Sequence, residues 1–385
     1  MKLSKLFNQF FHSEKSGGFI LIGCTAISLV LANSGIGSGY IDMWHAKVGT
    51  ESLEYWINDG LMAVFFLLIG LELEREIYAG ELSSLRQAAF PVVGALGGML
   101  VPAGIFLLIN RGLPSADGAG IPMATDIAFA LGILSLLGRR VPAVLKVFLT
   151  ALAVIDDLGA ILVIAIFYSD DIQSTNLFIA LGLFALLIVL NRLRVHVLWP
   201  YLLIGPVMWW FMLHSGVHAT ITGVLLAFAI PFGNGTEKSI SYKLQQALHV
   251  PVSFIILPLF ALANTAILIP SGWMEGFSSN LSLGIIAGLL VGKPVGILMF
   301  CALASLAGIA RLPEGLRWKH LAGAGMLAGI GFTMSIFITL LAFNDAGSVL
   351  QSKIAILGAS LVAAVAGLSW LAASLPRTNV TANGE

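Results

Sequence analysis

The sequence predicts an all-α polytopic membrane protein with about twelve transmembrane helices, and two observations lead to this fold class. The 385-residue chain is 58% hydrophobic and only 10% charged, and its mean hydropathy is +0.95, whereas a soluble domain carries about 25% charged residues. Apolar runs of about 20 residues, the length that spans a bilayer, recur along the whole chain. These observations exclude a soluble globular enzyme and indicate one transmembrane domain over residues 1–385.

The expected spans follow one another with short connections and no inserted soluble domain. The seventh and eighth are short and are separated by only a few residues, so this pair is the least distinct. An even number of spans places both termini on one side of the membrane. The twelve spans are expected to begin near Gly17, Leu53, Ala88, Gly118, Val144, Leu177, Val197, Gly216, Leu244, Leu283, His320 and Leu350.

The distribution of lysine and arginine predicts the orientation of the chain. If residues 1–16 are cytoplasmic, nearly all basic residues in the connections lie on the cytoplasmic side, and the tail at 378–385 lies there too. Little more than Lys47, Arg111 and Lys353 stands on the opposite side, which is a strong positive-inside bias. Because many spans follow, the first apolar run is expected to be an uncleaved helix rather than a signal peptide.

Charge, cysteine content and motifs exclude several other functions. The 20 basic residues balance the 20 acidic ones, so the chain lacks the basic field that nucleic-acid binding requires. Cys24 and Cys301 lie in apolar runs without metal-ligand spacing, which predicts neither a disulfide framework nor a zinc site. No phosphate-binding glycine-rich motif is present, so ATP is not the expected energy source. No cofactor is expected, and transport would run on ion gradients.

Two adjacent carboxylates, Asp156 and Asp157, lie in the middle of an apolar run. A charge at mid-bilayer costs about 2.5–3.5 kcal/mol, so such residues usually face a bundle interior and serve a function. Adjacent helical positions point about 100° apart, so one aspartate can face a cation site while the other faces a partner. Burial and a second carboxylate both favour protonation, so protons and a hard cation compete for the same oxygens. Such competition, combined with alternating access, is an antiport cycle; the alternative is a packed, hydrogen-bonded polar pair.

Two spans carry signals of an interrupted helix. In the fourth, Pro122 removes a backbone hydrogen bond just before Thr125 and Asp126. We expect freed carbonyls and the hydroxyl to be able to coordinate a cation, and Asp126 to neutralise the positive end of a half-helix. In the eleventh, glycines crowd the segment from Gly323 to Thr333, although glycines spaced this way also serve close helix packing. Interrupted fourth and eleventh helices are the pattern of two inverted repeats around a site at the membrane midplane.

Lys293 is the one basic residue within an apolar run that is available to balance these carboxylates, and Pro294 follows it at a possible kink. Its position indicates a functional or charge-balancing role. The protonated lysine can pair with Asp156, or its own proton can be exchanged during the cycle. The sequence leaves both alternatives open.

Other charged residues lie nearer the ends of the spans. Glu72 and Glu76 share one face at the inner end of the second span and are candidates for a funnel that attracts cytoplasmic cations, or for an ordinary solvated helix end. Asp59 is expected near the outer end, as a structural residue that caps a helix. His218 begins the eighth span near the outer face, where it can respond to pH or act as a hydrogen-bonded interfacial histidine.

Taken together, seven runs in order along nearly the full length of the chain resemble the NhaA-type sodium/proton antiporter family. Several such runs in the same order make a chance resemblance very improbable. The runs are Trp56–Phe66 (WINDGLMAVFF), Ala124–Phe129 (ATDIAF), Ala153–Gly159 (AVIDDLG), His214–Thr220 (HSGVHAT), Leu257–Asn264 (LPLFALAN), Val291–Pro294 (VGKP) and Gly329–Ser335 (GIGFTMS).

The resemblance implies a fold of twelve helices in two inverted repeats, with crossed, interrupted fourth and eleventh helices, in a homodimer within the bacterial cytoplasmic membrane. It implies that Asp156 and Asp157 bind the cation, Na+ or Li+, and the protons, and that Thr125 lines the site. Asp126 and Lys293 would balance the half-helix dipoles. It further implies electrogenic exchange of internal Na+ or Li+ for external protons, activated as cytoplasmic pH rises.

One departure from the family concerns the pH response. Relatives often carry an acidic residue and a histidine before the ninth span, where this chain has Gln245 and Gln246. The family's pH set-point therefore does not carry over, and Glu72, Glu76 and His249 are the candidate sensor residues.

Three other functions fit a membrane protein with buried carboxylates. An intramembrane aspartyl protease needs one aspartate from each of two facing helices, and its usual motifs are absent. A cation channel needs a continuous selectivity path and no proton coupling. A sodium-coupled symporter is the nearest rival, and it would need a solute pocket beside the ion site; whether sodium alone moves protons separates it from an antiporter.

Overall fold

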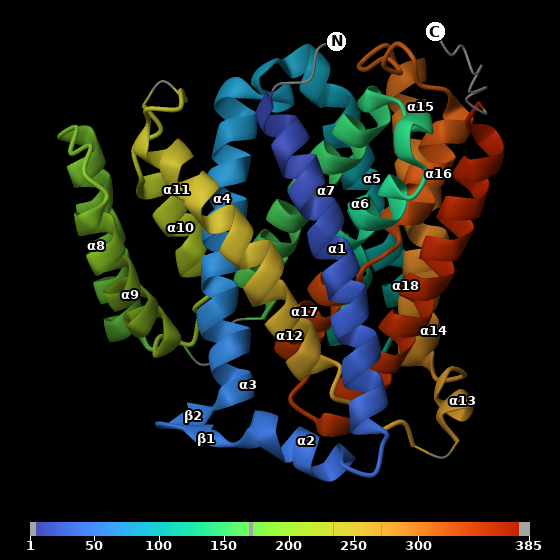
Figure 1. Ribbon diagram of the computed structural model, residues 1–385, viewed down its shortest axis with the longest axis horizontal. Helices are drawn as coiled ribbons and strands as arrows, with labels where there is room; N and C mark the ends of the chain where they lie inside the picture. Colours follow the sequence, from blue (N-terminus) through green and yellow to red (C-terminus); the bar gives the residue numbers. More distant parts are fainter. Residues whose placement is uncertain (1–4, 169–171, 234, 271, 377–385) are drawn as a thin grey trace, which may run out of the picture.

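The computed structural model describes residues 5–168, 172–233, 235–270 and 272–376 and consists almost entirely of helices (Figure 1). Residues 1–4 of the expected N-terminal segment and the expected tail at 378–385 lie outside the described residues. In the first half of the chain the elements are α1 (Lys5–Ala32), α2 (Gly37–His45), β1 (Lys47–Val48), β2 (Glu51–Ser52), α3 (Leu53–Tyr55), the π-helix η1 (Trp56–Leu61), α4 (Met62–Ala79), η2 (Glu81–Ser83), α5 (Leu85–Ile109), η3 (Pro114–Met123), α6 (Ile127–Ser135), η4 (Gly138–Arg140), α7 (Ala143–Phe167) and α8 (Ser174–Arg192).

The second half of the chain is built in the same way, with two further π-helical turns inside long helices. Its elements are α9 (Trp199–Leu213), α10 (Ile221–Ala229), α11 (Ile240–Pro251), the π-helix η5 (Val252–Ile256), α12 (Leu257–Asn264), α13 (Trp273–Gly276), α14 (Asn280–Ala287), the π-helix η6 (Gly288–Gly292), α15 (Lys293–Leu306), α16 (Trp318–Ala328), α17 (Phe332–Ala342) and α18 (Ala346–Ser374).

Within the described part of the chain, seven helical stretches are long and apolar enough to cross a membrane, and three bent helix pairs raise the number to ten. The prediction of a polytopic helical membrane protein is therefore confirmed. Two further expected spans coincide with α9, of 15 residues, and α10, of 9 residues, which are shorter than a bilayer requires. The number twelve and the inverted repeats remain predictions.

The two ends of the helical bundle differ. Between α1 and α3 the chain forms α2, bent by 115° from α1, and an antiparallel pair, β1–β2, in which Lys47 faces Ser52 and Val48 faces Glu51. The prediction of short connections was wrong here, because this stretch carries too few apolar residues in a row to reveal a separate element. Figure 1 shows α2 and the strands across one end, which we call the hairpin end. The helix α1 begins and α18 ends at the opposite end, which we call the termini end.

Close packing between α5 and α15 depends on glycine. A Cβ atom added at Gly97 would lie 2.2 Å from the carbonyl oxygen of Gly296, and one added at Gly296 would lie 2.1 Å from that of Gly97. Small residues let two helix backbones approach in this way inside a membrane.

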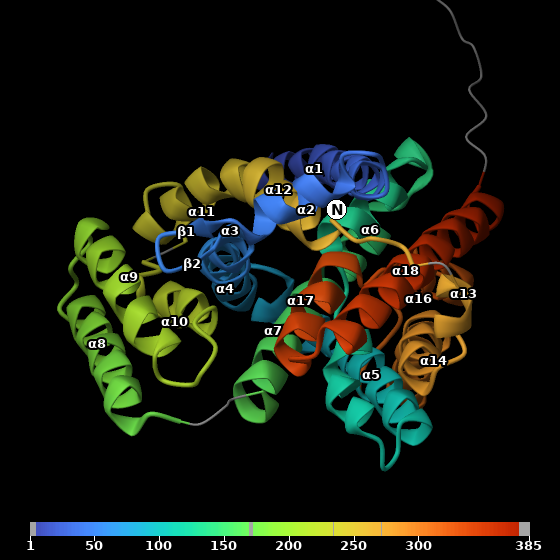
Figure 2. The same cartoon turned by 90° about the horizontal axis from the view of Figure 1, so that it is seen from below.

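The helices α8 and α9 lie at the edge of the bundle (Figure 2).

Both predicted helix interruptions are confirmed. The helical segment η3 ends at Met123, residues 124–126 are not helical, and α6 resumes at a bend of 44°. Likewise α16 ends at Ala328 and α17 begins at Phe332, with a bend of 46°. Pro122 and the glycine-rich run thus mark the two breaks. Proline lacks the N–H that continues the backbone hydrogen-bond ladder, and each glycine makes a helix about 1 kcal/mol less favourable than alanine does.

Candidate functional site

The two broken helices meet at their breaks, and each satisfies backbone groups of the other. The backbone N–H of Asp126 donates to the carbonyl of Ile330 over 2.7 Å, and the Ser335 hydroxyl donates to the carbonyl of Ile121 over 2.7 Å. Irregular backbone at membrane depth is tolerated only where protein groups or water replace the lost helical bonds. The crossing supplies such groups, so the breaks in η3–α6 and α16–α17 depend on each other.

Asp126 lies at the start of two half-helices at once. Its Oδ1 accepts a hydrogen bond from the Phe129 N–H at 2.9 Å, which caps α6. Its Oδ2 accepts one from the Thr333 N–H at 3.1 Å and another from the Thr333 hydroxyl, in the first turn of α17. Both half-helices therefore point positive N-terminal ends at one carboxylate, which is 2% exposed.

Asp156, in the middle of α7, is held at this crossing from two sides. The Lys293 ammonium donates to its Oδ2 over 2.5 Å and also donates to the carbonyl of Met123, the last residue of η3. The Thr125 hydroxyl lies 2.9 Å from the same Oδ2 and 2.9 Å from the carbonyl of Ala328, the last residue of α16. The expected pairing of Lys293 with Asp156 is therefore present.

Asp157, the next residue, is 1% exposed, and Asp156 is fully buried. Among the described residues, the Oδ1 atoms of both aspartates have no hydrogen-bond partner. In the same part of the chain, no group of three or more histidine, cysteine, aspartate or glutamate side chains is arranged to hold a metal ion. The oxygens open to a cation are therefore those of an adjacent carboxylate pair, with the Thr125 hydroxyl beside one of them.

Tyr168 ties the end of α7 to the half-helix η3, and sequence reasoning missed it. Its hydroxyl donates to the carbonyl of Asp117 over 2.7 Å and accepts from the Gly120 N–H at 3.2 Å. Burial raises the pKa of Tyr168 to about 12. The hydroxyl therefore stays protonated and links the helix that carries the aspartates to one of the broken helices. A lone tyrosine at the end of an apolar run carries no sequence signal for this role.

The acidic residues at the inner end of the second predicted span are packed against α11. Glu72 is 7% exposed and its Oε1 lies 3.9 Å from Nδ1 of His249, whereas Glu76 is half-buried. Glu74, which the sequence analysis did not single out, is 4% exposed, and the Ser241 hydroxyl donates to it over 3.5 Å. Glu72 is therefore not part of an ordinary solvated helix end.

One of the two glutamines that depart from the family pattern takes part in the same α4–α11 contact. The Arg75 guanidinium donates to the side-chain oxygen of Gln245 over 3.4 Å, and it lies 5.2 Å from the centre of the Tyr242 ring. An uncharged glutamine accepts this hydrogen bond without adding a negative charge to the cluster.

Asp59 and His218 lie on other elements. Asp59 is half-buried within the π-helix η1, and the helix start before it is capped by Ser52, whose hydroxyl accepts from the Tyr55 N–H at 3.1 Å. The expectation that Asp59 caps a helix was wrong, because the helix begins several residues earlier. His218 is half-buried in the connection between α9 and α10.

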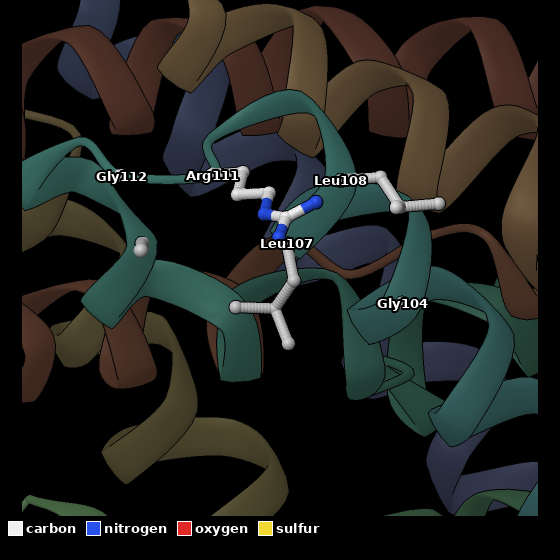
Figure 3. Close-up of a pocket in the computed structure, with 6 residues that line it drawn as sticks. Gly104, Leu107, Leu108, Arg111 and Gly112 are labelled. Carbon is white, nitrogen blue, oxygen red and sulfur yellow. The ribbon is translucent and has the colours of Figure 1, made fainter.

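A surface pocket lies elsewhere, at the connection between α5 and η3 (Figure 3). None of the predicted site residues lines it. The pocket is lined by Gly104, Leu107, Leu108, Arg111, Gly112 and Ala116.

Known proteins resemble this chain along nearly its full length. The family model described as "Na+/H+ antiporter 1" matches residues 8–371. A relative from Flavobacterium psychrophilum named "Na(+)/H(+) antiporter NhaA" is 62% identical over 367 residues, which cover 95% of this chain and 96% of the relative. Relatives with the same name from Dechloromonas aromatica and Escherichia coli O1:K1 are 58% and 49% identical over 374 and 379 residues. The first comparison covers 96% of both chains, and the second covers 95% of this chain and 98% of the relative.

Proposed function

This chain belongs to the Na+/H+ antiporter 1 family, and we propose from that premise that it exchanges internal Na+ or Li+ for external protons. The exchange is electrogenic, is activated as cytoplasmic pH rises, and proceeds by alternating access at the pair Asp156 and Asp157. The pair lies at the crossing of the two broken helices, which is where transporters of this architecture place an ion site.

The observation that carries this proposal is the state of the aspartate pair. Both carboxylates are buried, and each retains one oxygen without a protein partner among the described residues. Such an oxygen needs a proton or a cation, because a buried polar group without a partner is costly. Protonated and cation-bound states of the pair exclude each other, so binding of Na+ releases protons and binding of protons releases Na+.

Displacement of Lys293 from Asp156 by the cation accounts for more than one proton per cation. In the proton-loaded state, Asp157 is neutral and the protonated Lys293 balances the negative Asp156. Binding of one Na+ to two negative carboxylates releases the Asp157 proton. The cation also takes the place of the lysine against Asp156, so the buried ammonium loses its ion-pair partner and releases its proton as well. Two protons then exchange for one Na+, and one net charge crosses the membrane in each cycle. If the lysine kept its proton, only one proton would exchange and the cycle would be neutral.

The neighbouring residues stabilise the broken helices while the aspartate pair exchanges protons for a cation. Asp126 balances the N-terminal ends of α6 and α17, since it accepts hydrogen bonds from the first turn of each. Lys293 balances the C-terminal end of η3 through the Met123 carbonyl. Thr125 lines the cation site through its contact with Asp156.

We assign the remaining residues by their place along the transport path. Glu72, Glu76 and His249 form the pH-responsive inlet at the termini end, and Glu72 and His249 already lie within 3.9 Å of each other. His218 responds to pH near the hairpin end. Asp59 has a structural role at that end.

The proposed setting is the bacterial cytoplasmic membrane. The chain crosses it twelve times as two inverted repeats, with both termini in the cytoplasm, forms a homodimer and needs no cofactor. The hairpin end then faces outward and the termini end faces the cytoplasm, in agreement with the positive-inside distribution of basic residues.

The test is the collapse of a preformed pH gradient in inverted membrane vesicles when Na+ is added. We expect Na+ and Li+ to collapse the gradient, K+ to have no effect, and the rate to rise from mildly acidic to mildly alkaline pH. Asp157→Asn should abolish the response because it removes the titrating carboxylate. The matched control is Asp42→Asn, which changes an exposed aspartate on α2 and should leave the rate unchanged.

Electrogenicity is tested in the same vesicles with a potential-sensitive dye. We expect Na+ addition to change the membrane potential, and the exchange rate to rise when K+ and an ionophore hold the potential at zero. Folded wild-type protein that shows no Na+ response at any pH would refute antiport and favour sodium-coupled transport of a solute.

A further inference from the structure

A second buried ammonium group, Lys353 in α18, lies at the hairpin end and plays no part in the exchange described above. Its side chain is 9% exposed, and its Nζ donates to Oδ1 of Asn264 at the end of α12 over 3.3 Å. The same Nζ lies 3.9 Å from Oε1 of Glu54 in α3. One cation therefore joins the start of α18 to two other helices.

Asn264 extends these contacts to the π-helix that leads into α4. It is fully buried, and its amide group donates to Oδ1 of Asn58 over 2.7 Å and to the carbonyl of Phe260 over 3.0 Å. The Asn58 amide group in turn lies 3.5 Å from Oδ1 of Asn264. This oxygen thus accepts from both Asn58 and Lys353.

We call the four residues Glu54, Asn58, Asn264 and Lys353 the hairpin clasp. Figure 1 shows α3, the end of α12 and the beginning of α18 at the hairpin end, where the clasp joins them. At its edge, Nε2 of His45 on α2 lies 3.3 Å from Oε2 of Glu54. The clasp therefore holds together helices that lie more than 80 positions apart in the sequence.

The composition of the clasp argues against a purely structural role. An apolar contact of similar volume often stabilises a buried position as well as an ion pair does, because charges are costly to bring out of water. Polar contacts differ in one respect: water can replace each partner when the helices separate, so opening leaves no group without a hydrogen bond. In addition, Asn58 lies in a π-helical turn, an irregularity that occurs frequently at functional sites.

Packed apolar side chains lie between the clasp and the crossing of the two broken helices. Beneath the clasp, Met62 on α4 is fully buried, one turn after Asn58. The rings of Phe66 and Phe337 lie 5.2 Å apart, and those of Phe260 and Phe337 lie 6.4 Å apart. Phe337 belongs to α17, whose first turn contacts Asp126, so separation of the clasp would loosen the packing on the path to the aspartates.

We propose that the hairpin clasp is the closed outer gate of the exchange cycle and that Lys353 is the positioning residue that holds it shut. The proposal rests on the proposed function, because alternating access requires the outer side to be closed while the aspartates face the cytoplasm. The gate opens when water replaces the contacts of Lys353 with Asn264 and Glu54, and it closes when they form again.

The first test measures access from the outer face without requiring transport. Met62→Cys, in a background that carries Cys24→Ala and Cys301→Ala, places one thiol directly beneath the clasp. We expect Lys353→Met to raise the rate of labelling by an impermeant thiol reagent added outside by about tenfold, the equivalent of one hydrogen bond to a charged group. Lys353→Arg, which keeps the cation, should label at nearly the original rate.

Two controls separate gating from general damage. Lys47→Met removes an exposed lysine on the hairpin and should not change labelling. Glu54→Gln weakens the clasp by removing the negative charge beside Lys353, and it should also raise the labelling rate. This variant tests the proposal even if Lys353→Met fails to fold. Equal labelling in Lys353→Met, Glu54→Gln and the original background would overturn the proposal.

The second test measures the apparent affinity for Na+ separately from the inner side and from the outer side of the protein in reconstituted vesicles. A ligand's apparent affinity on one side is reduced by the fraction of molecules that are closed to that side. Loosening the outer gate should therefore strengthen apparent Na+ affinity from outside and weaken it from inside, whereas a structural defect would weaken both. Weaker apparent Na+ affinity on both sides, together with an unchanged labelling rate, would overturn the gate. Absence of Na+/H+ exchange in the wild type would overturn the proposed function. In that case the labelling comparison would still decide whether the clasp is a gate.

Discussion

Replacing Asp126 with alanine tests whether one carboxylate holds both broken helices in place. The carboxylate accepts hydrogen bonds from the backbone N–H groups of Phe129 and Thr333 and from the Thr333 hydroxyl. Alanine leaves two backbone donors without their acceptor, a part-buried one at the start of α6 and a buried one in the first turn of α17. The Thr333 hydroxyl can rotate toward another acceptor, so the two backbone donors account for most of the effect.

The magnitude follows from those two donors. A buried donor that loses its acceptor costs about 1–3 kcal/mol, so Asp126→Ala should lower the free energy of unfolding by about 2–6 kcal/mol. At roughly 2–4 °C per kcal/mol for a large domain, the apparent Tm should fall by roughly 4–24 °C. Thr333→Val keeps the backbone hydrogen bond and loses only the hydroxyl, so it should cost about 1 kcal/mol.

The assay is thermal unfolding of the purified protein in detergent, followed by tryptophan fluorescence. A single scan rate is used throughout, because irreversible unfolding makes the apparent Tm depend on the rate. Asp42→Ala, at an exposed position on α2, is the matched control. The double variant with Thr333→Val should resemble Asp126→Ala alone, because both changes remove the same interaction.

Two results would refute this reasoning. One is an apparent Tm of Asp126→Ala equal to that of the control, which would mean that water or a rearranged backbone replaces the carboxylate. The other is strict additivity in the double variant, which would mean that the two side chains act independently despite their contact.

Three further predictions concern other parts of the chain. Thr125→Val should raise the KM for Na+ in the vesicle assay by about tenfold, through loss of one hydrogen bond at the pair; an unchanged KM would exclude Thr125 from the site. Gly97→Ala should lower the apparent Tm by several degrees because its Cβ meets the Gly296 carbonyl, whereas Gly104→Ala, with open space around it, should not; equal values would contradict the close packing of α5 on α15. Hydrogen bonds from the start of α18 hold the pKa of Asp345 below its ordinary 3.8, so its stabilising effect is present above that pH and is lost as pH falls through the lower folded value. The Tm difference between wild type and Asp345→Ala should therefore shrink in acid, and a difference that does not vary with pH would count against the cap.

Several features of the fold could be predicted from the sequence because they depend on neighbouring residues. Long apolar runs predict helices that cross the bilayer, since each run satisfies its own backbone within one segment. Pro122 and the glycines between Gly323 and Thr333 predict the two breaks for a similarly local reason. The cost of burying charge singles out Asp156 and Asp157 without any knowledge of their surroundings.

Other local features left no trace in the pattern of residues. The three π-helical turns lie inside runs that are equally compatible with a regular α-helix, and β1 and β2 are only two residues each. Glu74 lies among other charges at the end of α4, so its burial against α11 depends on how that helix is rotated. The start of the helix at Ser52, which displaced Asp59 as the cap, likewise depends on how the hairpin ends.

Only the tertiary structure decided which polar groups meet. The sequence offered Asp156 as a partner for Lys293, but whether the two side chains meet depends on the depth and rotation of α7 against α15. The contact of Asp126 with Thr333 joins residues 207 positions apart, and that of Lys353 with Asn264 joins residues 89 positions apart. Neighbouring residues determine the conformation of a segment, whereas such contacts depend on the relative placement of whole helices, which the packing of many side chains determines together. The sequence alone therefore determined the membrane class, the breaks and the buried charges, and the tertiary structure determined the crossing of the broken helices and the clasp.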